Sequence, residues 1–155
     1  STNVFQQETG KFLKTYFPVA ERLDDALLNK IGTYQVSKKP YDFFGCTKKG
    51  IYWCAESKKV ITERFPIRNI ETHQRESLAK VSDNNGLSFL FINWRYKLSG
   101  ETIWITFNEY CEVEYELLSK NKKSLTPNDF DEDWFLVRKN QVWTIPNNHY
   151  LYNLI

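Results

Sequence analysis

A glutamate and a lysine, two positions apart, occupy one predicted strand of this sequence. The segment Ile51–Ile61 is rich in β-branched and aromatic residues, which predicts a strand. Because side chains alternate along a strand, Glu56 and Lys58 share one face and Ser57 takes the other. The lead-in to this pair is apolar, so we expect it to lie inside a sheet. A buried charged pair is costly unless something uses it.

A second carboxylate, Asp42, lies 14 positions before Glu56. It belongs to Tyr41–Phe44, a shorter predicted strand, and a turn around Lys48-Lys49-Gly50 separates the two strands. If they pair as a hairpin, the two carboxylates converge. Two close carboxylates repel each other and favour a divalent cation, and oxygen ligands suit Mg²⁺ or Mn²⁺.

Such an arrangement could hydrolyse a phosphodiester. The metal would activate a water and polarise the phosphate, and Lys58 would hold the water or stabilise the charge that develops. An aspartate followed by Glu-x-Lys also occurs by chance in charged proteins. The spacing alone therefore leaves open a purely structural salt bridge.

The elements that position these residues follow from periodicity. Apolar residues recur at helical spacing over Thr2–Leu28, and Pro18 should break or restart this helix. The next stretch, Val19–Ile31, is again helical, and Gly32 suits its C-terminal end. The other predicted elements are helices over Ile70–Val81 and Glu109–Leu118 with Asn69 and Asn108 as N-caps, strands over Leu87–Trp94 and Glu101–Phe107, and a hairpin from Trp134–Arg138 and Val142–Ile145. This order predicts an α/β (α+β) fold, a central mixed sheet flanked by helices, in one domain over residues 1–155.

Composition limits the class of protein. Aromatic residues make up 16% of the 155 residues, which excludes intrinsic disorder. The three cysteines form no CxxC pair, so we expect neither a disulfide framework nor a zinc site. There is no signal-peptide pattern and no apolar run long enough to span a membrane. We therefore expect a cytoplasmic protein with no membrane partner.

Charge is distributed unevenly, although the formal net charge is only +2. Residues 38–75 contain nine basic and four acidic residues, whereas residues 109–133 contain three lysines and eight acidic residues. A basic surface around a metal site suits the phosphates of nucleic acid, because each contact releases counterions. An ordinary solvated surface is the alternative.

Five short segments follow one another in a recognisable order: Asp42-Phe43-x-Gly45, Glu56-x-Lys58, Phe65-Pro66-Ile67, Asn69-Ile70 and His73-Gln74. Together they resemble the RecU-like Holliday junction resolvases of the PD-(D/E)XK nuclease superfamily. The resemblance covers roughly residues 38–94 well and the C-terminal third loosely. It implies a restriction-endonuclease-like core that cuts four-way DNA junctions.

The resemblance also implies roles for individual residues. Asp42 and Glu56 would bind the metal, Gln74 would complete its shell, and Lys58 would stabilise the transition state. A glutamate of the N-terminal helix, Glu8, is a further candidate ligand, although an acid of a first helical turn is also favoured by the helix dipole. The candidate DNA-binding residues are Lys38, Lys39, Lys59, Arg64, Arg68, His73 and Arg75.

The chain departs from the family pattern in three places. Pro40 stands where the family has a threonine that serves as a metal ligand. The long stalk insertion is absent or greatly shortened, since only Gly32–Lys39 is available for it, and the N-terminal helix matches poorly. A two-fold dimer, which the family resemblance implies, would present two sites to the two equivalent strands of a junction.

Two other functions remain open. The shortened stalk favours a restriction- or repair-type nuclease on linear duplex DNA. The proline in place of threonine favours a non-catalytic junction-binding module.

Overall fold

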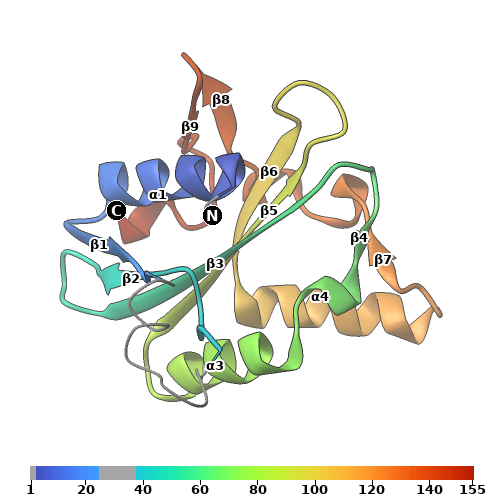
Figure 1. The fold of residues 1–155 in the computed structure, drawn as a ribbon, viewed down its shortest axis with the longest axis horizontal. Helices are drawn as coiled ribbons and strands as arrows, with labels where there is room; N and C mark the ends of the chain where they lie inside the picture. The colour runs from blue at the N-terminus through green and yellow to red at the C-terminus, as the bar shows by residue number, and fades with distance from the viewer. Residues whose placement is uncertain (1–2, 25–37) are drawn as a thin grey trace.

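A five-stranded mixed sheet lies at the centre of the computed structural model, which describes residues 3–24 and 38–155 (Figure 1). The strand order is β1-β2-β3-β5-β6, and only the β3–β5 pair is parallel. The strands are β1 (Val19–Arg22), β2 (Phe43–Cys46), β3 (Tyr52–Val60), β5 (Leu87–Trp94) and β6 (Glu101–Thr106). This architecture confirms the fold class expected from the sequence.

Helices cover both faces of the sheet. Helix α1 (Val4–Tyr16) packs on one face, and α3 (Thr72–Asp83) and α4 (Phe107–Ser119) lie on the other (Figure 1). Two hydrophobic clusters fill the two layers, one around Phe12 and Trp104 and the other around Leu78 and Tyr110. Strand β5 is buried from Ser88 to Trp94 between them, and its nearly continuous apolar sequence is typical of a strand that is covered on both faces.

The N-terminal segment corrects one expectation. Asn3 caps α1, and the helix ends at Tyr16, shortly before Pro18. The continuation of the helix into residues 19–22 is wrong, because Val19–Arg22 forms the edge strand β1. Pairing with β2 overrides helical periodicity there, and Gly45 permits it, since a Cβ at that position would lie 1.9 Å from the Val19 carbonyl oxygen. The expected helix end at Gly32 and the stalk segment fall mostly within residues 25–37, outside the described residues.

Two helix caps also differ from expectation. Glu71, rather than Asn69, caps α3, through a capping box with Gln74. Thr106, rather than Asn108, caps α4, because its hydroxyl oxygen accepts a hydrogen bond from the backbone N–H of Glu109. Both α3 and α4 therefore begin within two residues of their predicted starts.

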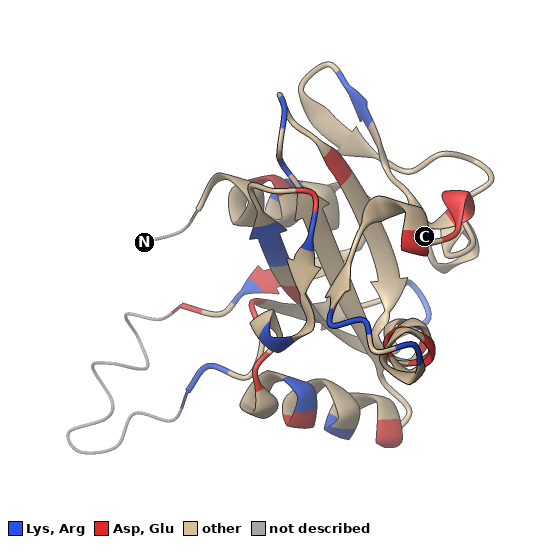
Figure 2. Cartoon of the chain, turned by 90° about the vertical axis from the view of Figure 1, so that its right-hand side faces the viewer, with Lys and Arg blue, Asp and Glu red and all other residues tan. Residues whose placement is uncertain are grey.

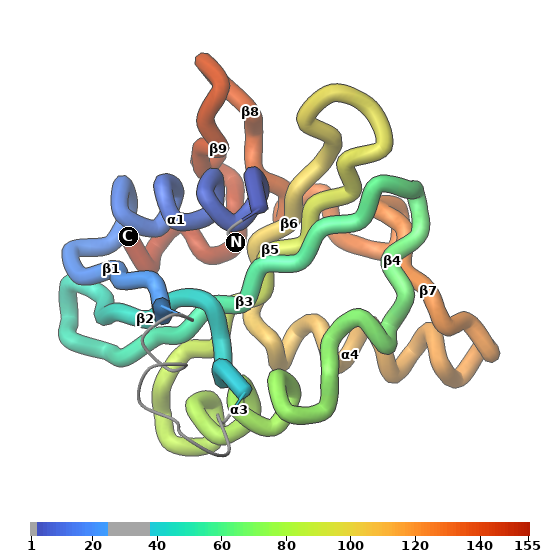
Figure 3. Tube along the Cα trace, viewed as in Figure 1, coloured from blue at the N-terminus to red at the C-terminus, as the bar shows by residue number. Residues whose placement is uncertain are grey.

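The remaining elements are short. The strand pairs are β4 (Phe65–Pro66) with β7 (Ser124–Leu125) and β8 (Val137–Lys139) with β9 (Val142–Thr144), and single-turn helices span Ile67–Asn69, Pro127–Asp129, Glu132–Trp134 and Tyr152–Leu154. The C-terminal hairpin is confirmed, although its first strand begins three residues later than predicted. This hairpin and the β5–β6 connection project from the same end of the molecule (Figure 3). In the described ranges, no helix is long and apolar enough to cross a membrane.

Candidate active site

The β2–β3 hairpin brings Asp42 beside Glu56. In the antiparallel register Phe43 lies opposite Ala55, and the backbone N–H of Asp42 donates to the Ala55 carbonyl at 3.0 Å. Both carboxylate residues are buried, with exposed fractions of 6% for Asp42 and 3% for Glu56. The convergence predicted from the spacing is therefore present in the fold.

Ser57 fixes the Asp42 carboxylate. One carboxylate oxygen of Asp42 accepts from the backbone N–H of Ser57 at 2.9 Å and from its hydroxyl at 3.0 Å. The other oxygen lies 3.2 Å from the Lys39 ammonium nitrogen. A carboxylate with two neutral donors and one cation is held in one orientation. Sequence reasoning assigned Ser57 only to the opposite face of the strand and gave it no role.

The Glu56 carboxylate has two polar neighbours. The Lys58 ammonium nitrogen lies 3.6 Å from one carboxylate oxygen of Glu56, and the Gln74 side-chain amide donates to the same oxygen at 3.0 Å. Burial and the nearby charge of Asp42 raise the pKa of Glu56 to about 8, although Lys58 and Lys39 oppose the shift. The site therefore holds a carboxyl group that is costly to ionise without a further cation.

Gln74 links this site to the start of α3. Its amide oxygen accepts from the backbone N–H of Glu71 at 3.0 Å, which closes the capping box, while its amide nitrogen faces Glu56. The family resemblance placed Gln74 with Asp42 and Glu56, and in the fold its side chain contacts Glu56. Its role in binding a metal stays a prediction. In this arrangement its oxygen serves the helix cap and its nitrogen orients Glu56.

The donor chemistry fits a hard divalent cation. Two buried carboxylates lie together, and the pKa of Glu56 is raised first by burial and second by the charge of Asp42, both of which a cation would offset. Residues 3–24 and 38–155 contain no group of three or more His, Cys, Asp or Glu side chains that could hold a metal. Asp42 and Glu56 would therefore hold Mg²⁺ or Mn²⁺ together with waters or neutral oxygens, which is the usual manner for Mg²⁺.

Glu8 is engaged elsewhere. Its carboxylate pairs with Arg95 and with Arg138, and it accepts from the Trp143 indole at 2.8 Å. Burial alone would raise the pKa of Glu8, but these hydrogen bonds and charges lower it below its ordinary value. The assignment of Glu8 as a metal ligand stays a prediction, made for a carboxylate that already has three partners.

The predicted DNA-binding residues divide into two groups. Lys59, Arg64 and Arg68 are exposed, and Lys38 and His73 line a hollow of about 960 Å³ between the start of α3 and α4. Lys39 and Arg75 are instead paired with carboxylates, Lys39 with Asp42 and Arg75 with Glu114.

The Arg75 guanidinium connects three segments of the fold through hydrogen bonds. It makes a two-pronged contact with Glu114, at 2.7 and 2.8 Å, and donates to the carbonyl oxygens of Ile67 and Ile70. It thereby joins α3, α4 and the turn before α3. Helix α3 carries acidic as well as basic residues along its length, so it does not present a uniformly basic surface (Figure 2).

Comparison with known proteins identifies the family. The family described as Recombination protein U matches residues 14–152, whereas no curated protein matches. Among solved structures, the chain is similar to Hjc of Archaeoglobus fulgidus, a Holliday junction resolvase from an archaeal hyperthermophile. The two share 12% sequence identity with a TM-score of 0.47, over 96% of this chain and 89% of that chain. Because the family match spans most of the sequence, the chain belongs to the RecU family of Holliday junction resolvases, as the sequence motifs indicated.

Proposed function

We propose that this chain resolves Holliday junctions as a divalent-metal-dependent endonuclease, with Mg²⁺ or Mn²⁺ at Asp42 and Glu56. The observation that carries the proposal is the burial of these two carboxylates side by side, with the pKa of Glu56 raised to about 8. A bound cation would activate water and polarise the scissile phosphate. Family membership supports the choice of a four-way junction as substrate.

The residues of the site divide the remaining work. Ser57 holds Asp42 in a fixed orientation, and Gln74 does the same for Glu56. Lys58 carries its positive charge at the same carboxylate, where it would stabilise negative charge that develops on the phosphate. Because these groups are fixed before substrate arrives, little reorganisation is needed at the moment of reaction.

Exposed basic residues would hold the DNA backbone beside the site. Lys59 is exposed within β3 next to Lys58, while Arg64 and Arg68 flank β4. We assign these three residues and Lys38 to phosphate contacts. A homodimer would supply the second cut, and a recombination enzyme of this family would act in the cytoplasm.

One observation favours a second candidate, a junction-binding module without catalysis. Lys39 and Lys58 pair with Asp42 and Glu56 respectively, so the two carboxylates already have two positive partners. A buried network of this kind can be purely structural. In that case the protein would bind junctions without any metal-dependent turnover.

Cleavage of a synthetic four-way junction tests the proposal. Wild-type protein with Mg²⁺ should cut the junction faster than the linear duplexes that make up its arms. Glu56→Gln should lower the rate by at least about 100-fold, because it removes a charged metal ligand. Glu63→Gln, which changes an exposed glutamate in the turn after β3, is the matched control and should retain wild-type activity.

Each alternative has its own outcome. Equal rates on the junction and on its arms would favour a nuclease of linear duplex DNA. Binding without metal-dependent cutting would favour the non-catalytic module. Unchanged cleavage by the Glu56→Gln variant would refute the metal-site assignment.

A further inference from the structure

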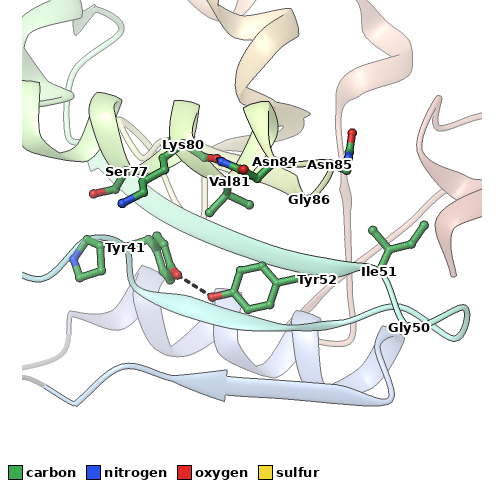
Figure 4. A pocket seen from close by; sticks show the side chains of 11 residues that line it. Tyr41, Gly50, Ile51, Tyr52, Ser77, Lys80, Val81, Asn84, Asn85 and Gly86 are labelled. Carbon is green, nitrogen blue, oxygen red and sulfur yellow. Dashed lines mark hydrogen bonds between the residues drawn. The ribbon is translucent and has the colours of Figure 1, made fainter.

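A cavity of about 710 Å³ lies beside the candidate active site, between the start of β3 and the end of α3 (Figure 4). Tyr41 and Tyr52 lie on one side of it, and the side chains of Ser77 and Lys80 reach from α3 on the other side. Its volume is within the usual range for pockets that bind small organic groups. Neither the metal site nor the proposed phosphate contacts use these residues.

The cavity and the carboxylates share one face of the sheet. Tyr52 and Glu56 are four positions apart on β3, so their side chains point to the same side at a separation of about 13 Å along the strand. Helix α3 spans both places, because Gln74 contacts Glu56 while Ser77 and Val81, three and seven positions later, line the cavity. A strand of DNA bound at the carboxylates would therefore reach this cavity within a few nucleotides.

The two tyrosines form an ordered aromatic surface. Their hydroxyl oxygens lie 2.5 Å apart in a hydrogen bond that joins the segment before β2 to β3. Phe44 stacks against Tyr52, with ring centroids 6.5 Å apart and planes 24° from parallel. Tyr52 is nevertheless 41% exposed. An aromatic ring that is held in place yet remains open is suited to stacking against a flat group.

The opposite side of the cavity is polar and carries a positive charge. Lys80 is exposed, and no ion pair joins it to another residue within the described ranges. Asn84 donates its side-chain amide to the Lys80 carbonyl at 2.8 Å, which leaves its amide oxygen as an acceptor at the rim. The cavity thus combines an aromatic ring, a hydrogen-bonding amide and a cation.

We propose that this cavity binds one unstacked nucleobase of the DNA strand that passes the Asp42–Glu56 site. The base stacks on Tyr52, and Lys80 contacts an adjoining phosphate. Stacking on an aromatic side chain is a general way to hold an unpaired base whatever its identity. The inference rests on the proposed function, since it places the strand by reference to the candidate active site.

The test combines an abasic scan of the DNA with tyrosine variants of the full chain. Synthetic four-way junctions carry one abasic nucleotide at successive positions on either side of the branch point, and binding is measured by fluorescence anisotropy without divalent metal, so that nothing is cut. Wild-type protein should lose roughly ten-fold in affinity at one or two positions. Tyr52→Ala should bind the intact junction roughly ten-fold more weakly than wild-type protein does. An abasic nucleotide at those positions should not lower the affinity of this variant further, because the base and the ring form one contact.

Matched variants separate stacking from a general disturbance. Tyr52→Phe keeps the ring but loses the hydroxyl, and it should retain the wild-type abasic pattern. Tyr115→Ala removes a tyrosine that is 78% exposed on α4, outside the cavity, and it should also retain the pattern. Lys80→Gln should weaken binding of every junction by the same factor and should reduce its salt dependence.

The outcomes separate this inference from the proposed function. If wild-type protein binds and, with Mg²⁺, cuts the junction but shows no position-specific abasic penalty, the base-binding cavity is refuted while the proposed function stands. The same holds if the penalty persists unchanged in Tyr52→Ala. If wild-type protein neither binds nor cuts the junction, the proposed function fails, and this inference fails with it.

Discussion

The pH dependence of metal binding is the sharpest consequence of the buried carboxylate pair. Burial and the charge of Asp42 raise the pKa of Glu56 to about 8, so at pH 7 about nine tenths of the metal-free protein carries a protonated Glu56. A divalent cation binds the ionised carboxylate and must displace that proton. At pH 7 this costs about 1.4 kcal/mol, so binding should be about ten-fold weaker than at pH 9.

Isothermal titration calorimetry with Mn²⁺ measures both parts of this prediction. The logarithm of the association constant should rise by about one unit for each pH unit between pH 6 and pH 7.5, and it should level off above about pH 8. Titrations at pH 7 in two buffers of different ionisation enthalpy should show release of about 0.9 proton per bound ion. Glu56→Gln should abolish this release, and Glu63→Gln, with its exposed carboxyl group, should leave it unchanged.

The same experiment decides the role of Glu8. If Glu8→Gln binds Mn²⁺ as wild type does, its carboxylate serves only Arg95, Arg138 and Trp143. A large loss of affinity would instead make it a ligand. Metal binding with no proton release near neutral pH would refute the account of Glu56, because an ordinary carboxyl group is already ionised there.

Three further predictions concern stability and DNA affinity. Glu56→Gln should stabilise the metal-free protein by about 1–3 kcal/mol at pH 9, because Glu56 is ionised there in the wild type. The substitution should have little effect at pH 5, where Glu56 is protonated, and urea unfolding at both pH values measures the difference. Arg75→Gln should lower the free energy of unfolding by about 2–4 kcal/mol, because it leaves Glu114 buried without its partner, and an unchanged urea midpoint would contradict the structural role. Arg68→Gln should leave the fold intact and reduce the slope of log affinity against log salt by about one, as anisotropy on a duplex will measure.

The sequence predicted the part of the site that depends on strand geometry. A period of two fixes which side chains share a face, and a short turn forces neighbouring strands to pair, so the convergence of Asp42 and Glu56 follows from spacing. The resemblance to the family then placed Gln74 beside them, which spacing alone would have left on a solvated helix face. These contacts are local or connect consecutive elements.

What the sequence could not predict depends on contacts between distant segments. Val19–Arg22 has helical periodicity but pairs with β2, and nothing within those four residues signals the partner. Arg75 looks like one more basic residue near the site until Glu114, 39 positions later, packs beside it. Glu8 likewise meets Arg138 only because α1 and the C-terminal hairpin lie together in the fold.

The role of Ser57 was missed for a different reason. Its position on the strand was predicted correctly, but a serine between two charged residues gives no sequence signal of a bond to Asp42. The bond arises because the chain already runs alongside β3 at Asp42, one residue before β2 begins at Phe43. A search for hydroxyl residues next to each predicted metal-binding carboxylate could have found it.

The most direct measurement is a crystal structure of the protein soaked in Mn²⁺, with data collected near the manganese absorption edge. Our account predicts one anomalous peak in contact with carboxylate oxygens of both Asp42 and Glu56, with Gln74 still beside Glu56. It also predicts that Lys39 moves away from Asp42, since the cation replaces its charge. No peak between the two carboxylates at saturating Mn²⁺, with both lysines still paired to them, would contradict the central claim and leave the pair as a structural salt-bridge network.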